Sequence, residues 1–461
     1  MRECPGIYCR PGCAARPRAE NVRTFELAAA AEAAGFRACL RCRPYRVADA
    51  VAADAPELVC RAVQMIIGGT LDDGTEAGLG RRLGISPRHL RRLFNEHLGV
   101  TPDQLARSRR AHFARRLLDD SDLAIAEIAF ASGFGSLRQF NRTTREVFHA
   151  SPRELRQRRR CTDRLAADGG LTLRLPFGTP FDWEAMIGFL AARAIPGVEA
   201  VESGVYRRTI VIDGDPGVLE VHPGGTDHLL LRAHLPYWEG LIHVVERVGR
   251  MFGLDTDLAP AERDLAEDVL LGPLVAAHPG LRVPGAWGPF EVGVQAIVGE
   301  HCALDTARER MGRLAERHGP TIPGLTHGLA HAFPSADALA TAELGAIGLP
   351  QQVTQAVQGF ARAVVAGDVQ LDGSAALGGL IASVTAVAGV GSGAAQLLAL
   401  RLGERDAFPS SDPRVRRALG QLAPDAGDTA SITESWRPWR SLATMLLLLQ
   451  VGCATPAEAV T

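Results

Sequence analysis

The sequence predicts a multidomain, mainly α-helical protein. It begins with a small cysteine-rich domain and continues with a double helix-turn-helix, a small antiparallel α+β domain and an all-α C-terminal domain. Three observations support this prediction. Four cysteines lie in two close pairs near the N-terminus, two similar helical units follow between residues 57 and 160, and alternation of apolar and polar residues gives way to helical periodicity after residue 241.

The 461 residues are enough for three or four domains, and their charge is unevenly distributed. Residues 1–160 hold 28 Arg against 18 acidic residues, whereas the remainder holds 22 against 34. The basic N-terminal part indicates nucleic-acid binding, and the remainder indicates a catalytic or regulatory part.

No apolar run reaches the ~18 residues of a membrane span. We therefore expect a soluble, cytoplasmic, nucleoid-associated protein with no membrane partner.

The cysteine pairs have the spacing of a metal site. In Cys9-x3-Cys13 and Cys39-x2-Cys42, each short loop turns two thiolates toward one point, as a tetrahedral Zn²⁺ site requires. Disulfides are the alternative, and they are disfavoured because no signal peptide precedes the pairs and the rest of the chain is typical of a cytosolic protein. The sequence predicts one zinc ion.

The residues around these cysteines identify a family. The stretches Gly6–Cys13 and Ala34–Pro44 resemble the N-terminal zinc domain of Ada-type adaptive-response proteins. The resemblance implies that Cys9 accepts a methyl group from a methylphosphotriester in damaged DNA, and that the other three cysteines are spectator ligands. It begins at Gly6, so the family's upstream segment is expected to lie before Met1 or to be trimmed. The Pro-Cys-His-Arg site of Ada's second half is absent.

The middle segment contains two helical units, each with a tight glycine turn and a second helix opened by a serine N-cap. The Gly133-Phe134, Phe140, Arg142 and Ser151-Pro152-x3-Arg156 spacing resembles AraC-type DNA-binding domains. The resemblance implies that the polar faces of the second helices bind promoter DNA. It also implies a monomeric activator whose protein partner is RNA polymerase. A solvated arginine face is the alternative. The predicted DNA contacts are Arg88, Arg91, Arg92, Arg138, Gln139, Asn141 and Arg142.

The next segment has the pattern of a small sheet covered by a helix. Strands are predicted at 171–175, 205–212, 218–221 and 229–231, and a helix at 181–193. The predicted domains are 1–52 (zinc), 53–160 (double helix-turn-helix), 171–250 (α+β) and 251–461 (all-α), with a linker at 161–170.

The C-terminal domain carries a hairpin motif. Gly389-x-Gly391 joins two helical stretches, and Ser411-Asp412-Pro413 follows about 20 residues later. Together with the stretches 188–194, 284–299 and 436–441, this arrangement resembles the helix-hairpin-helix DNA glycosylases of the AlkA (3-methyladenine) type. The resemblance implies that the hairpin binds a DNA phosphate and that Asp412 is the catalytic carboxylate. The alternative role for Asp412 is a helix N-cap. Since the chain has no lysine, the glycosylase is expected to be monofunctional.

The predicted substrate pocket departs from that family. Phe189 is retained, but Gly393 and Leu397 replace two aromatic residues, and Glu300-His301 replaces a Gln-Leu pair whose second residue fills the gap left by a flipped base. Aromatic stacking is worth ~1–3 kcal/mol per base. We therefore expect release only of bases with an already labile glycosidic bond, such as 3-methyladenine or 7-methylguanine. The alternative is a transcription regulator whose glycosylase half is degenerate and serves as a scaffold or DNA-binding module.

Overall fold

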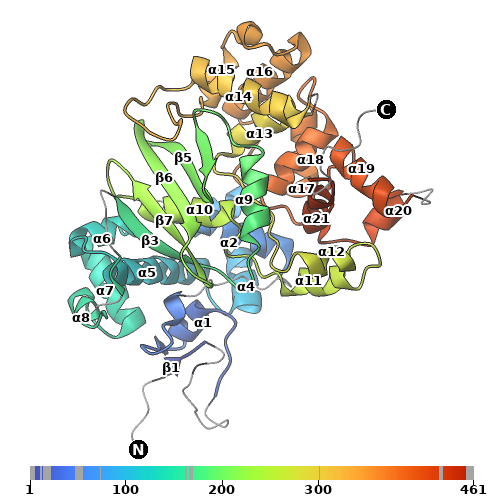
Figure 1. The fold of residues 1–461 in the computed structure, drawn as a ribbon. Helices are drawn as coiled ribbons and strands as arrows, with labels where there is room; N and C mark the ends of the chain where they lie inside the picture. The colour runs from blue at the N-terminus through green and yellow to red at the C-terminus, as the bar shows by residue number, and fades with distance from the viewer. Residues whose placement is uncertain are drawn as a thin grey trace, which may run out of the picture. The chain divides into compact units, whose positions relative to one another are not determined.

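A computed structural model describes residues 6–10, 13, 22–46, 55–72, 74–160, 163–165, 170–300, 302–424 and 429–452. The chain forms two compact units. The first is drawn from 1–178, 223–249 and 254–257, and the second from 179–222, 250–253 and 258–461. Figure 1 shows that helices predominate in both units, which confirms the predicted mainly α, multidomain fold.

The first unit begins with a small cysteine-bearing module. Strand β1 (Ile7–Tyr8) pairs in parallel with β2 (Arg37–Ala38), and helix α1 (Ala28–Ala33) and the 3-10 helix η2 (Pro44–Arg46) flank the second strand in sequence. A glycine at position 6 is required because any side chain there would collide with Phe36. This packing holds the ends of both strands, and therefore the cysteines that follow them, close together.

Seven helices of the first unit form the double helix-turn-helix. Those at residues 57–67, 76–82, 87–98 and 102–120 share one apolar core around Leu79, Leu90 and Phe94, all at most 1% exposed. Ser86 and Ser136 cap the second helix of each unit, as predicted, by accepting the His89 and Gln139 N–H groups at 3.2 Å. The helices are α2 (Glu57–Ile67), α3 (Glu76–Arg82), α4 (Pro87–Leu98), α5 (Pro102–Asp120), α6 (Ile125–Ala131), α7 (Leu137–Phe148) and α8 (Pro152–Gln157).

The predicted antiparallel strands are present. In the first unit β3 (Leu171–Pro176) pairs with β7 (His228–His234), followed by α10 (Leu241–Met251). In the second unit β5 (Val205–Ile212) pairs with β4 (Glu199–Glu202) and with β6 (Asp215–Pro223). Strand β4 is not among the predicted strands because its sequence, Glu-Ala-Val-Glu, has only one β-branched residue.

The rest of the second unit is helical. Its core lies around Phe360 and Leu398, between the helices at residues 289–299, 304–318, 351–366 and 392–401. None of the described helices is both long and apolar enough to cross a membrane. The helices are α9 (Trp183–Ala191), α11 (Ala259–Ala266), α12 (Gly272–Ala277), α13 (Pro289–Gly299), α14 (Leu304–His318), α15 (Ala336–Ala340), η4 (Leu344–Ile347), α16 (Gln351–Ala366), α17 (Leu377–Thr385), α18 (Ser392–Arg401), α19 (Pro413–Leu422), α20 (Thr429–Glu434) and α21 (Arg440–Gly452).

A buried ion cluster fixes α13 against the strands of the second unit. Arg208 on β5 is 2% exposed, and its guanidinium contacts Glu291 Oε2 at 2.8 Å and Glu199 Oε1 at 3.4 Å. Burial of a single charge would be costly, so these groups stabilise the unit only as a set. Because Glu291 lies in the first turn of α13, the cluster also fixes the position of the residues in the later turns of this helix.

Candidate functional site

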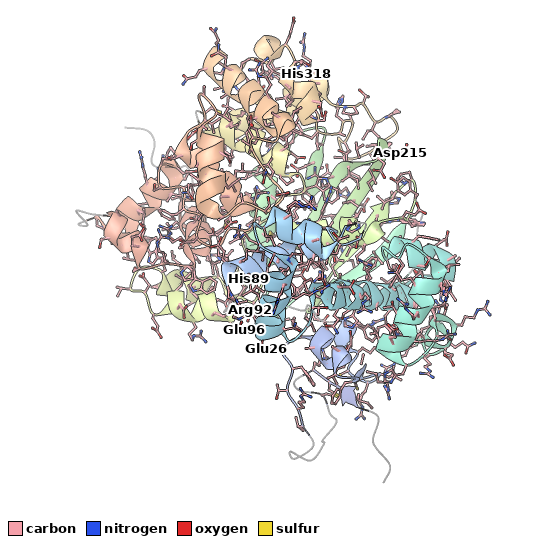
Figure 2. The ribbon with its side chains drawn as sticks, turned by 180° about the vertical axis from the view of Figure 1, so that it is seen from behind. Glu26, His89, Arg92, Glu96, Asp215 and His318 are labelled. Atoms are coloured by element: carbon pink, nitrogen blue, oxygen red, sulfur yellow. The ribbon has the colours of Figure 1, made fainter. Side chains whose placement is uncertain are left out.

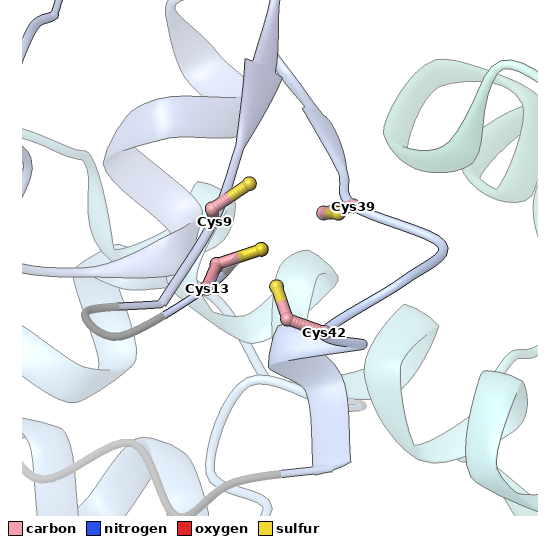
Figure 3. A group of neighbouring side chains, drawn as sticks. All are labelled: Cys9, Cys13, Cys39 and Cys42. Carbon is pink, nitrogen blue, oxygen red and sulfur yellow. The ribbon is translucent and has the colours of Figure 1, made fainter. Parts of the chain in front are cut away.

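The four predicted zinc ligands converge. The Sγ atoms of Cys9, Cys13, Cys39 and Cys42 all lie within 4.8 Å of one another, and Figure 3 shows them facing a common space. A tetrahedral ion with Zn–S bonds of ~2.3 Å would place sulfurs about 3.8 Å apart. The donor set and the spacing therefore fit zinc with only a small contraction.

The four thiols differ in exposure and in their surroundings. Cys9 is exposed, Cys13 and Cys42 are half-buried, and Cys39 is buried. Burial and hydrogen bonds with neighbouring thiols raise the pKa of Cys9. Burial alone would also raise the pKa of Cys39, but the Cys42 and Arg41 N–H groups lower it to about 7. Cys9 is therefore the most exposed residue of the four.

The module is tied to the long helix α5 on both sides of the cysteines. The Tyr8 hydroxyl, next to Cys9, donates to Glu32 Oε1 at 2.7 Å, and His112 Nε2 on α5 lies 2.5 Å from the same oxygen. On the other side, Arg46 in η2 pairs with Asp120 at the end of α5 at 2.8 Å. The two contacts made with α5 link residues more than 70 positions apart, so spacing along the chain gave no signal of them.

The second helix of each helix-turn-helix unit, α4 and α7, presents its predicted polar face to solvent. Arg88, Arg91, Arg92, Arg138 and Arg142 are exposed, while Gln139 and Asn141 are half-buried. Figure 2 shows His89, Arg92 and Glu96 along α4.

Several of these side chains also have partners within the protein. Arg91 pairs with Glu76, Arg142 Nε lies 3.7 Å from Glu146, and Asn141 donates to the Leu137 carbonyl at 2.8 Å. Both guanidinium groups are exposed, so these pairs are weak and leave the guanidinium groups available to an anion.

A cavity of about 590 Å³ in the second unit contains the predicted catalytic carboxylate. Asp412 lines it together with Gly393 and Leu397 from α18. Asp412 is also the N-cap of α19: Oδ1 accepts the Arg414 N–H at 2.8 Å, and Oδ2 pairs with the Arg414 guanidinium at 2.6 Å. Burial alone would raise the pKa of Asp412, but these bonds and the Arg414 charge lower it below its usual value.

The hairpin amides already hold a carboxylate. Glu300, at the end of α13, accepts the Gly391 N–H at 3.1 Å and the Ala394 N–H at 3.3 Å. A Cβ at Gly391 would collide with Glu300, and one at Gly393 would collide with the Ser411 hydroxyl, so a larger residue at position 393 would require Ser411 to move. Gly389 supplies the positive φ of the turn, +84°. His301 lies outside the described residues.

Phe189 occupies a different place from the one predicted. It is not among the residues lining the cavity, and it is 6% exposed. The Arg193 guanidinium lies 3.7 Å from the centre of its ring, and the Arg401 guanidinium lies 5.3 Å from it. The arginines therefore contact the aromatic face, and Arg193 rather than Phe189 lines the cavity.

The fold and these sites define a DNA-repair regulator of composite architecture, and comparison with known proteins agrees. Family models match at residues 3–45 (metal binding domain of Ada), 79–158 (helix-turn-helix domain) and 172–288 (AlkA N-terminal domain). The chain is 36% identical over 454 residues to the "Probable bifunctional transcriptional activator/DNA repair enzyme AlkA" of Mycobacterium tuberculosis, covering 96% of this chain and 90% of that protein. The chain belongs to this family of bifunctional activator and repair enzymes.

Two further comparisons concern the C-terminal part. The chain is 29% identical over 272 residues to the DNA-3-methyladenine glycosylase 2 of Escherichia coli, covering 57% of this chain and 92% of that protein. A 3-methyladenine DNA glycosylase from Archaeoglobus fulgidus superposes with a TM-score of 0.52 at 20% identity, covering 61% of this chain and 98% of that one. The second likeness establishes a shared glycosylase fold.

Proposed function

We propose that this chain is a bifunctional protein of the response to DNA alkylation. It accepts methyl groups from methylphosphotriesters at Cys9 and activates transcription, and it is a monofunctional glycosylase that releases alkylated bases such as 3-methyladenine. Its partners are promoter and alkylated double-stranded DNA and RNA polymerase, and it acts as a cytoplasmic monomer. One combination of features in this chain supports the proposal. Cys9 is exposed in a four-sulfur cluster, and the Asp412 carboxylate lies in the cavity of the glycosylase fold.

Methyl transfer at Cys9 follows from its exposure. One zinc ion held by Cys9, Cys13, Cys39 and Cys42 would keep the sulfurs as thiolates at neutral pH. The Cys9 sulfur then attacks the methyl carbon of the neutral phosphotriester. An S–C bond forms, the C–O bond breaks, and its electron pair stays on the phosphate oxygen, which leaves an ordinary anionic phosphodiester.

Incubation with DNA that carries methylphosphotriesters is expected to add one methyl group to Cys9 and to no other cysteine. Replacing an anionic sulfur by a thioether lowers repulsion with DNA phosphates, so operator binding should tighten. Mass spectrometry of peptides locates the methyl group. Cys9→Ser should remain unmodified and Cys60→Ser should react normally. An unmodified Cys9 in the zinc-loaded protein would leave the cluster with a structural role only.

Base release follows from the position of Asp412. Its lowered pKa keeps the carboxylate ionised, so it can stabilise the positive charge that develops on the sugar of a flipped nucleotide. Water completes the hydrolysis, because a chain without lysine cannot form a lysine Schiff base with the sugar. Release of free base from methylated duplex DNA by the wild-type protein tests this activity.

The second candidate is a regulator whose glycosylase half only binds DNA or serves as a scaffold. The ion pair between Asp412 and Arg414, together with the loss of the aromatic walls, favours it. A base-release rate equal to that of DNA alone would select this candidate.

Glu300→Gln is expected to tighten binding of duplex DNA by about two- to tenfold at low salt, because a DNA phosphate at the hairpin must displace the Glu300 carboxylate from the Gly391 and Ala394 amides. The measurement is fluorescence anisotropy with an undamaged duplex. Glu316→Gln, an exposed acid on α14, makes the same change of charge away from the cavity. Equal effects of the two variants would argue that the hairpin contacts no phosphate.

A further inference from the structure

The first helix-turn-helix unit contains an ion pair whose residues are replaced in the second. Glu76 is the first residue of α3, and its carboxylate accepts the Nε–H group of Arg91, the fifth residue of α4. The corresponding residues of the second helix-turn-helix unit are Ile125, the first residue of α6, and Asn141, the fifth residue of α7. The two units therefore present different chemistry at the same place on their second helices.

The two side chains of this pair differ in exposure. The Glu76 side chain is 11% exposed, whereas the Arg91 side chain is 60% exposed. The other carboxylate oxygen of Glu76 accepts the backbone N–H of Asp103, in the first turn of α5, at 3.4 Å. The carboxylate is therefore held by contacts from two further helices, while the arginine that it contacts extends into solvent.

The bond at Nε leaves the outer end of the guanidinium available to a ligand. In the described ranges of the chain, the Nη groups of Arg91 form no hydrogen bond within the protein. The two Nη groups form a planar fork that matches O6 and N7 of guanine in the major groove. An arginine already oriented at Nε loses less side-chain freedom when it makes this contact. The exposed pair is weak in stability, but positioning requires only that it favours one orientation.

We propose that Glu76 positions Arg91 to read a guanine in the major groove, which makes the first helix-turn-helix unit specific for one G·C base pair of the operator. This inference rests on the proposed binding of promoter DNA and concerns which base that binding selects. The sequence predicts Arg91 as a DNA contact, whereas Glu76, 15 positions away, is not among the predicted contacts. Glu76 is a positioning residue, because it acts through Arg91.

Arg142 on α7 provides a comparison within the same chain. Its Nε lies 3.7 Å from Glu146, which is four positions later on the same helix. The side chains of Arg142 and Glu146 are 67% and 52% exposed, so packing holds neither of them. Glu146 therefore lowers the local charge without fixing the direction of an arginine, and it supplies a matched control for Glu76.

The test begins with the selection of binding sites from a random duplex library by the zinc-loaded protein. Fluorescence anisotropy then gives the affinities for the selected duplex, for its single base-pair variants and for an unrelated duplex. Replacing one G·C pair should weaken wild-type binding by about fivefold or more. Arg91→Met should lose this discrimination, and Glu76→Ala should lower it to about twofold or less. Glu76→Gln, which keeps an acceptor oxygen, should be intermediate.

Two further measurements identify the guanine contact and separate positioning from structure. Guanine without N7, as 7-deazaguanine at that pair, should weaken binding by the wild type and not by Arg91→Met. Because Glu76→Ala removes a negative charge, its affinity for the unrelated duplex should equal or slightly exceed that of the wild type. Glu146→Ala makes the same change of charge and should keep the wild-type discrimination at the pair that Arg91 reads.

The outcomes are distinct. Wild-type discrimination by Glu76→Ala, at the pair that Arg91→Met no longer distinguishes, would overturn the positioning role. Weaker binding of both duplexes by Glu76→Ala would overturn it as well, because damage to the helices lowers every affinity. Equal discrimination by the wild type and Arg91→Met at every G·C pair would overturn the guanine contact. If the wild type selects no sequence, the proposed promoter binding itself fails, and the inference fails with it.

Discussion

Asp412→Asn is expected to lower the rate of 3-methyladenine release by at least ~100-fold, because it removes a charge that acts mainly in the transition state. Asparagine is as good an N-cap as aspartate, so α19 should still begin at Pro413. The measurement is release of free base from methylated duplex DNA under single-turnover conditions.

The matched control is Asp182→Asn. Asp182 is the N-cap of α9 and accepts the Ala185 N–H at 3.0 Å, but it does not line the cavity. It makes the same chemical change at a helix N-terminus of the same unit and should retain most of the activity. Equal slow rates for the wild type and Asp412→Asn would show that Asp412 is only a cap.

The pH dependence of base release should follow the lowered pKa of Asp412. The active form is the carboxylate, which stays ionised down to a pH below the usual range of an aspartic acid. Activity should therefore persist from pH 7 to about pH 5, and loss through Asp412 should begin only at still lower pH.

Cys39→Ala is expected to abolish tight zinc binding and to loosen the N-terminal module. Binding of structural zinc is worth ~10–16 kcal/mol in small domains and is in effect folding energy. Cys39 is the buried member of the quartet and accepts the Arg41 N–H at 3.4 Å, so its loss removes a ligand that solvent cannot easily replace. Metal analysis after dialysis against a chelator gives the zinc content, and limited proteolysis reports the loosening of α1 and η2.

Cys60→Ala is the control for this experiment. Cys60 lies on α2, and its thiol donates to the Ala55 carbonyl at 3.5 Å, away from the cluster. This variant should keep the wild-type zinc content. A full equivalent of zinc in Cys39→Ala would show that the predicted quartet is wrong.

Local features of the fold could be predicted because residues only a few positions apart in the sequence determine their geometry. The serine caps at Ser86 and Ser136 each need only a polar residue three positions before an N–H group that donates no helical hydrogen bond. The strand at Val205–Ile212 alternates at the period of a sheet and was predicted with its observed bounds. The cysteine quartet belongs to the same class, because each pair is brought together by its own loop.

The sequence by itself therefore determined the domain types, the four-cysteine cluster, the two helix-turn-helix units and the position of Asp412 before α19. Only the tertiary structure decided which side chains line the cavity. Glu300 accepts a hydrogen bond from the Gly391 amide, 91 positions away, and Arg193 contacts the Phe189 ring and lines the same cavity as Asp412. The physical reason is that spacing encodes contacts within a turn or a strand pair. Which distant charges meet depends on how the whole core packs, and a lost aromatic residue does not reveal what fills its place.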